Sequence, residues 1–140
     1  ARSAMQLGAC LAGLAIENSM LGAAHALANP LTAHFNIVHG QAVASMLPHV
    51  IRFNARSMES QYCQLASATN AVTGDNSEAL ATFIAEITQR SGLATRLEPQ
   101  GVNAAELPML AADAVKQWTA QFNPLTVEVE DLLTLYQQAF

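Results

Sequence analysis

Apolar residues recur along most of the chain with the period of three to four residues that is typical of amphipathic helices. The clearest run places apolar side chains at i, i+3, i+4 and i+7: Leu80, Phe83, Ile84 and Ile87. Asn76 or Ser77 can cap the start of this segment, and Gly92 supplies its stop. No segment shows a convincing strand pattern, so the chain is predicted to be all-α.

The same pattern predicts helices at residues 3–20, 22–28, 40–53, 55–71, 77–91 and 108–122, and a last helix that starts at Thr126 or Glu128. Proline is expected to interrupt two of them, because it disfavours helix for the residue before it: the second should change course near Pro30, and Pro48 should kink or restart the third. Residues 32–38 have no helical period and are predicted to be a loop, and Asn103 to Glu106 has the spacing of a capping box. The expected architecture is a bundle of six to eight helices.

Residues 3–20 mix strong helix formers with small side chains, including Gly8 and Gly13. Glycine inside a helix costs about 1 kcal/mol relative to alanine, so its use here indicates a close approach between helices. This first helix is therefore expected to lie at the centre of the bundle.

The chain is 51% hydrophobic and only 12% charged. One explanation is that part of the surface faces other protein, and the other is that Ala-rich helices are simply poor in charge. Both remain open. The formal charge of −5 and the single lysine, Lys116, leave no basic stripe for phosphates, which argues against nucleic-acid binding.

The apolar run at residues 7–16 is too short to span a bilayer, and no signal peptide is recognisable. The two cysteines, Cys10 and Cys63, lie in predicted helices far apart in sequence, a usage that suits free thiols in a reducing compartment. We therefore expect a cytoplasmic protein without a membrane partner. The abrupt start, without an initiator methionine, is a first hint of a fragment.

All four histidines lie between positions 25 and 49, and His25 and His39 form the pair with a mechanical rationale. They are 14 residues apart, which on one straight helix means roughly 21 Å. They can converge only if the chain reverses between them, which Pro30 and the irregular stretch after it permit. Imidazoles suit Fe or Zn, so a convergent pair makes half of a metal site. On the residues alone, an ordinary core or surface histidine is the better interpretation.

Three stretches change that balance: residues 13–31 around His25, residues 36–43 around His39, and residues 46–54, Met-Leu-Pro-His-Val-Ile-Arg-Phe-Asn. Together they resemble the long second motif of the iron-containing (group III) alcohol dehydrogenases, and the tail around residues 130–136 resembles the closing helices of that family. The likeness covers essentially all 140 residues. It implies the C-terminal helical domain of a dehydroquinate-synthase-like fold.

The resemblance implies that His25 is the third metal ligand of the family and His39 the fourth. The first two, an Asp and a His in a D-x-x-x-H motif, are expected upstream of Ala1, because no such motif occurs in the chain. No Gly-rich strand–turn–helix for a dinucleotide is found either. Residues 1–140 are thus expected to be a partial, metal-binding C-terminal domain without its nucleotide-binding domain.

Several other positions acquire expected roles from the resemblance. Asn29 stands where many relatives have a second histidine that serves the nicotinamide or a proton relay, and Thr32 replaces the usual glycine. The pocket for nicotinamide and substrate is expected near Asn18, Leu21 and Ile16, although ordinary core packing is an equal alternative for them. His34 is interpreted as pocket rim or surface, and His49 as structural.

The chemistry implied for the parent protein is reversible hydride transfer between NAD or NADP and a small alcohol or aldehyde, with Fe²⁺ or Zn²⁺ as Lewis acid. The fragment alone is expected to be inactive, and it should either form a homo-oligomer or pack on the missing N-terminal domain. The alternative is a stand-alone helical module that binds a metal or a partner without catalysis.

Overall fold

A computed structural model describes residues 1–69 and 71–140, and every regular element in this part of the chain is a helix. The six α-helices are α1 (Arg2–Glu17), α2 (Ala23–Phe35), α3 (His39–Ser67), α4 (Ser77–Arg90), α5 (Leu107–Ala114) and α6 (Val129–Ala139). Three short 3-10 helices are η1 (Glu98–Gln100), η2 (Ala104–Glu106) and η3 (Trp118–Phe122). The absence of strands from these residues confirms the predicted all-α class.

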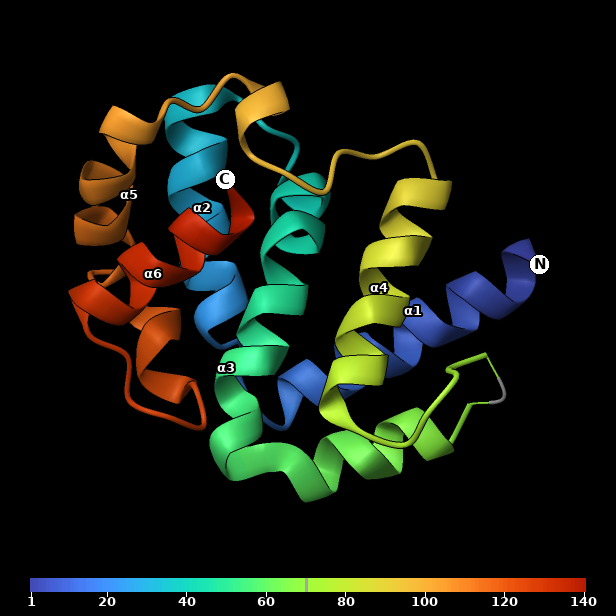
Figure 1. Ribbon diagram of the computed structural model, residues 1–140. Coiled ribbons are helices and arrows are strands. Elements are labelled where there is room, and N and C mark those ends of the chain that lie inside the picture. Colours follow the sequence, from blue (N-terminus) through green and yellow to red (C-terminus); the bar gives the residue numbers. More distant parts are fainter. Residues whose placement is uncertain (70) are drawn as a thin grey trace.

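The hydrophobic core surrounds α2, which packs against α3, α5 and η3, while α6 packs against α5 and α3. Its largest fully enclosed side chains are Leu27, Leu31, Met46, Leu97, Leu110, Leu132, Leu135 and Tyr136. Figure 1 shows α2, α3, α5 and α6 gathered on one side of the molecule, with α4 and α1 on the other. Each enclosed leucine stabilises the fold by about 1.5–3 kcal/mol relative to an exposed one. The helix that carries His25 is therefore the most firmly held.

Helix α2 continues through Pro30, against the prediction of a turn at this residue and a loop at residues 32–38. Leu27 and Leu31, on either side of the proline, are fully buried, and this burial offsets the roughly 3 kcal/mol that an internal proline costs. The helix ends instead at Asn36, whose φ of 54° lies in the left-handed region and whose N–H donates to the Thr32 carbonyl. The chain thus reverses at residues 36–38.

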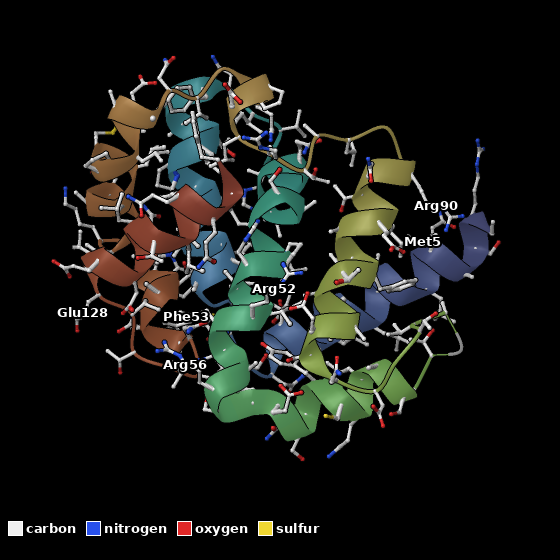
Figure 2. The ribbon with its side chains drawn as sticks, in the orientation of Figure 1. Met5, Arg52, Phe53, Arg56, Arg90 and Glu128 are labelled. Atoms are coloured by element: carbon white, nitrogen blue, oxygen red, sulfur yellow. The ribbon has the colours of Figure 1, made fainter. Side chains whose placement is uncertain are left out.

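Helix α3 likewise runs through Pro48 as one element of 29 residues, so the alternative of a new helix after Leu47 does not occur. Met46, Pro48 and Val50 are all buried, so packing again overrides the local cost of proline. Figure 1 shows that α3 changes direction in its green part, and Figure 2 places Phe53 and Arg56 close to that bend. Helix α3 therefore connects the core around α2 with α4, and it packs against both helices.

Helix α4 confirms the predicted caps. The Asn76 side chain accepts a hydrogen bond from the Ala79 N–H at 2.8 Å, and Gly92 takes a φ of 75° just after the helix ends. The apolar face is only partly covered, since Ile87 remains 44% exposed. This helix packs on α3.

Helix α1 does not lie at the centre of the bundle, as the small residues had indicated. None of its residues is buried, and a Cβ added at Gly8 or Gly13 would meet nothing within 4 Å. The glycines therefore serve no close helix contact among the described residues. A row of large apolar side chains, Leu7, Leu11 and Leu14, is left open on one face of α1, and Met5, Ile16 and Met20 are exposed as well.

Capping boxes start the two C-terminal helical segments. The predicted box of Asn103 and Glu106 is present and begins η2, which leads directly into α5, and a second box pairs Glu128 with Asp131 at the start of α6. Helix α5 is shorter than the predicted 108–122, because Gln117 adopts an extended backbone and η3 follows.

No helix in residues 1–69 and 71–140 combines the length and the apolar character that crossing a bilayer requires. Within the same residues Cys10 and Cys63 are both free thiols, as expected.

Candidate metal centre

His25 and His39 lie together in space. His25 is the third residue of α2 and His39 the first of α3. Their ring centroids are 5.4 Å apart and the ring planes are inclined by 45°. The convergence of the two histidines that the sequence analysis anticipated is present in the structure. Their role as ligands stays a prediction.

The surroundings favour the uncharged form of His25. Partial burial lowers the pKa of this imidazole, and the neighbouring His39 lowers it further, because two adjacent positive rings repel. His25 also lies in the first turn of a helix, where the positive end of the helix dipole disfavours another positive charge. A neutral imidazole has the free nitrogen lone pair that a metal ion needs.

The part of the chain that the structure describes supplies two nitrogen ligands here and no more. No group of three or more His, Cys, Asp or Glu side chains that could hold an ion occurs in it. A catalytic iron or zinc ion usually takes three or more protein ligands with an open position. The chemistry of the two imidazoles suits a divalent transition metal, and an ion held here would need further ligands from outside the described residues.

A buried asparagine pair, which the sequence did not reveal, fixes the start of α2. The side chains of Asn54 and Asn123 exchange two hydrogen bonds of 3.0 and 2.7 Å. Asn123 also accepts a bond from the Ala23 N–H at 3.3 Å and donates one to the Leu125 carbonyl. Space is tight as well, because a Cβ at Gly22 would come within 3.1 Å of the Asn123 side-chain oxygen. This network holds the backbone two residues before His25.

A second buried hydrogen bond anchors the middle of α2. The Tyr136 hydroxyl of α6 donates to the Leu27 carbonyl at 2.6 Å, and its side chain is fully enclosed. Burial raises the pKa of this phenol, with the Asp113 charge as a smaller cause. The hydroxyl thus stays protonated and serves as a donor at any ordinary pH.

Asn29 lies one helical turn after His25 and is partly buried. Its amide donates to the side-chain oxygen of Gln117 at 2.9 Å. Because i and i+4 share a helix face, Asn29 and His25 project from the same side of α2. The expected place of Asn29 beside the metal pair is thus compatible with the fold, and its role with the cofactor stays a prediction.

The other predicted cofactor residues make no hydrogen bond to the histidine pair. Asn18 is exposed and donates to the Leu14 carbonyl at 2.8 Å, while Leu21 is half-buried in the connector before α2. Ile16 is 42% exposed on α1. Thr32 has a buried hydroxyl without a partner among the described residues. The nicotinamide-lining role of Asn18 and Leu21 therefore stays a prediction.

His34 and His49 belong to other surroundings. His34 is exposed, and its imidazole contacts the Asp113 carboxylate at 3.0 Å. Hydrogen bonds from Lys116 and from His34 lower the pKa of Asp113. His49 lines a pocket with Arg52 and residues of α6, where burial, followed by the Arg52 charge, lowers its pKa. His34 is thus a surface residue, as interpreted from the sequence.

A largely apolar pocket of about 590 Å³ is lined by Val38 and Gly40, the chain neighbours of His39, but not by His39 itself. Its walls come from the end of α2, the turn into α3 and the connector after α4, and they include Phe35, Ile37, Val38, Gly40 and Leu93. A small organic molecule fits a pocket of this size and character.

Comparison with known proteins agrees with this geometry. The family model described as "Fe-containing alcohol dehydrogenase family, C-terminal" matches residues 1–140. The chain is 31% identical to the 1,3-propanediol dehydrogenase of Citrobacter freundii over 149 aligned residues, covering 100% of this chain and 38% of that protein. It is 33% identical to the lactaldehyde reductase of Escherichia coli, covering 97% and 37%.

Solved structures show the same helical arrangement. A 1,3-propanediol oxidoreductase superposes with a TM-score of 0.77 at 28% identity, covering 86% of this chain and 33% of that one. The alcohol dehydrogenase from Oenococcus oeni gives a TM-score of 0.83 at 24% identity, covering 93% and 35%, and this likeness concerns the fold alone.

The chain thus spans less than two-fifths of the length of the curated relatives quoted above. The match of the C-terminal family model over residues 1–140, together with the shared helical fold, shows that the chain belongs to the Fe-containing alcohol dehydrogenase family, as its C-terminal domain.

Proposed function

We propose that these 140 residues form the metal-binding part of a dehydrogenase that transfers a hydride reversibly between a small alcohol and NAD or NADP. The observation that carries the proposal is the approach of the His25 and His39 rings, 5.4 Å between centroids, within a domain of this family. The printed names of similar proteins support the reaction class: a lactaldehyde reductase, an NADPH-dependent butanol dehydrogenase and a sulfoacetaldehyde reductase solved with NAD⁺.

Fe²⁺ or Zn²⁺ is the metal that the two imidazoles suit. Bound there, such an ion supplies Lewis acidity to the alcohol or carbonyl oxygen of the substrate. The contribution of this chain is to present two imidazoles, those of His25 and His39, from the first turns of α2 and α3. The remaining ligands, an Asp and a His, would come from outside residues 1–140.

Asn29 is proposed to orient the substrate or the nicotinamide. It lies on the same face of α2 as His25, and its amide is held by Gln117 at 2.9 Å. An amide has no pKa in the working range, so Asn29 positions a group and does not carry a proton. Leu21 and Asn18 are kept as proposed lining residues on the side of α1.

The exposed face of α1 is proposed to pack on the remainder of the parent protein, or on a second subunit. Leu7, Leu11 and Leu14 share this face and are 61%, 57% and 57% exposed, and no residue of α1 is buried. Apolar side chains that gather on one helix in this way mark an interaction surface.

The test is to replace each histidine in the full-length protein and to measure bound metal and alcohol oxidation together. We expect His25→Ala and His39→Ala to lose both, because removing one ligand of four destabilises the ion at its site. His34→Ala, an exposed histidine paired with Asp113, is the matched control and should keep both. Full metal content and activity in His25→Ala would overturn the ligand assignment.

The second test concerns the 140 residues alone. Two ligands hold a metal weakly, and the domain carries no recognisable dinucleotide motif. We expect no change in nicotinamide absorbance with a small primary alcohol, with or without added Fe²⁺ or Zn²⁺. Metal-dependent turnover would overturn the partial-enzyme interpretation. Tight zinc binding without turnover would favour the alternative of a stand-alone metal-binding module.

A further inference from the structure

The basic residues of this acidic chain are unevenly placed. The chain carries a formal charge of −5 and only six Lys and Arg residues. Three of these six, Arg52, Arg56 and Arg96, line two pockets that share His49, Arg52 and Gln138 as common walls. We call the two pockets together the basic groove. It is distinct from the His25–His39 pair, neither of which lines it.

The groove has room for a small molecule. The pocket that contains Arg56 has a volume of about 450 Å³ and lies between α3 and α6, and the pocket that contains Arg96 adds about 250 Å³ toward α4. Figure 2 shows Arg52 and Arg56 emerging from neighbouring turns of α3. The shared walls make one continuous surface from Arg56 to Arg96.

Arg56 is held in place and keeps donors to spare. Its guanidinium lies 4.2 Å over the centre of the Phe53 ring, and its Nε donates to the Phe53 carbonyl at 3.2 Å. No carboxylate pairs with it among the described residues. The two terminal nitrogens are thus available to an anion, and a guanidinium offers them in the forked geometry that suits phosphate and carboxylate.

Arg96 marks the other end. Its Nε donates to the Phe140 backbone oxygen at 2.9 Å, and its contact to Glu98 is long, 3.5 Å, between two side chains that are each more than 60% exposed. Such an exposed pair contributes little, so an incoming anion can replace Glu98 at low cost. Arg52 between them is paired with Glu78 through two short bonds and serves as part of the wall.

One acidic residue also lines the groove. Asp131 belongs to the capping box of α6, where its carboxylate accepts a hydrogen bond from the Glu128 N–H at 3.1 Å. The N-terminus of α6 offsets part of this negative charge. The polar ends of Thr134 and Gln138 add neutral groups that can hydrogen-bond a ligand.

We propose that the basic groove binds a small molecule with two acidic groups, phosphates or carboxylates, one held by Arg56 and the other by Arg96. The groove lies apart from the paired histidines, so the ligand is an effector or a second ligand, and the proposal does not depend on the dehydrogenase reaction. His49 and Gln138 lie between the two arginines and would contact the middle of the ligand.

The test is calorimetric titration of the protein with pyrophosphate and, separately, with succinate at about 50 mM salt, where charges are weakly screened. We expect binding of at least one probe, weakened about tenfold by Arg56→Gln and about tenfold by Arg96→Gln, since each removes a charged hydrogen bond. Arg90→Gln removes the same charge outside the groove and should leave the affinity unchanged. Arg56→Lys, which keeps the charge and loses the fork, should fall between wild type and Arg56→Gln.

Equal affinity in Arg56→Gln, Arg96→Gln and Arg90→Gln would overturn the site, and so would a wild-type protein that binds neither probe. If only one of Arg56→Gln and Arg96→Gln lost affinity, the inference that one ligand contacts both arginines would be wrong. Thermal unfolding of each variant should match that of wild type. This result would show that the loss of affinity comes from the site and not from misfolding. We expect the metal content of the full-length protein to be the same in every variant as in wild type. Failure of the groove proposal can therefore be distinguished from failure of the proposed dehydrogenase function.

Discussion

The four histidines between positions 25 and 49 are the same residue type in three different environments. His25 and His39 face each other, His34 contacts Asp113, and His49 lines the basic groove. The pairing of His25 with His39 could be predicted because the family motif names both. The contact of His34 could not, because its partner lies 79 residues further along the chain and only tertiary packing brings it near.

The Asn54–Asn123 pair is a second contact that could not be predicted from the sequence. Asn54 and Asn123 are nearly inaccessible and satisfy each other, yet nothing in the sequence pairs them, since Asn54 ends the motif at residues 46–54 and Asn123 lies 69 residues further along. Buried amides are retained where they replace backbone hydrogen bonds that the local fold leaves open. Here they complete the start of α2, and so they position His25 from a distance.

We therefore expect Asn123→Ala to destabilise the protein by about 2–4 kcal/mol, because it strands the Asn54 amide, the Ala23 N–H and the Leu125 carbonyl in a buried place. Urea unfolding measures the loss. Asn18→Ala is the matched control, since that side chain is exposed and makes one bond within its own helix. It should change the free energy of unfolding by less than about 0.5 kcal/mol. Equal effects in both variants would contradict the structural role of the pair.

At the scale of elements, helix ends were better predicted than helix interiors. Asn76, Gly92 and the Asn103–Glu106 box act where their local chemistry places them. Pro30 and Pro48 do not interrupt their helices, because burial of the neighbouring apolar side chains outweighs a local penalty. Caps depend on a few adjacent residues, whereas the fate of an internal proline depends on packing that the sequence pattern does not display.

The link between α3 and α4 should depend on pH. Arg52 binds both oxygens of Glu78, at 2.7 and 2.6 Å, and this hydrogen bonding lowers the pKa of Glu78. A lowered folded pKa means that the pair stabilises the fold above the unfolded pKa of about 4.3, and that this contribution disappears as the pH falls through the folded pKa. Because the Glu78 side chain is 63% exposed, the contribution is at most about 1 kcal/mol.

We expect Glu78→Gln to be less stable than wild type at pH 7 and nearly equal to it at about pH 3, where the wild-type carboxylate is protonated. Thermal unfolding at both pH values measures the difference. Glu86→Gln, on the same helix and in no ion pair among the described residues, should show no such dependence. A constant difference between Glu78→Gln and wild type at both pH values would contradict the pairing.

At the scale of the whole molecule, the low charge of the chain has a structural counterpart. Of the two explanations that the composition left open, an Ala-rich interior and a surface that faces other protein, both have support. The core contains many alanines, including Ala23, Ala26 and Ala28, and α1 presents a row of exposed apolar side chains. The sequence could not separate the two explanations, because the same small and apolar residues serve a core helix and a docking helix.

Amide hydrogen exchange can test whether the apolar side chains of α1 serve to dock other protein. In the 140 residues alone, α1 has no buried side chain, so its hydrogen bonds are supported only by the helix itself, and a helix of 16 residues is marginal in water. Its amides should exchange close to the rate of an unfolded chain, while those of α2, which packs against α3, α5 and η3 in the core, should exchange only on global unfolding. In the longer parent protein we expect α1 to become protected, because its apolar row is then covered, and α2 to stay protected as before. Strong protection of α1 in the isolated domain would show that it packs on this domain after all, and weak protection in the parent would leave its apolar row without the proposed partner.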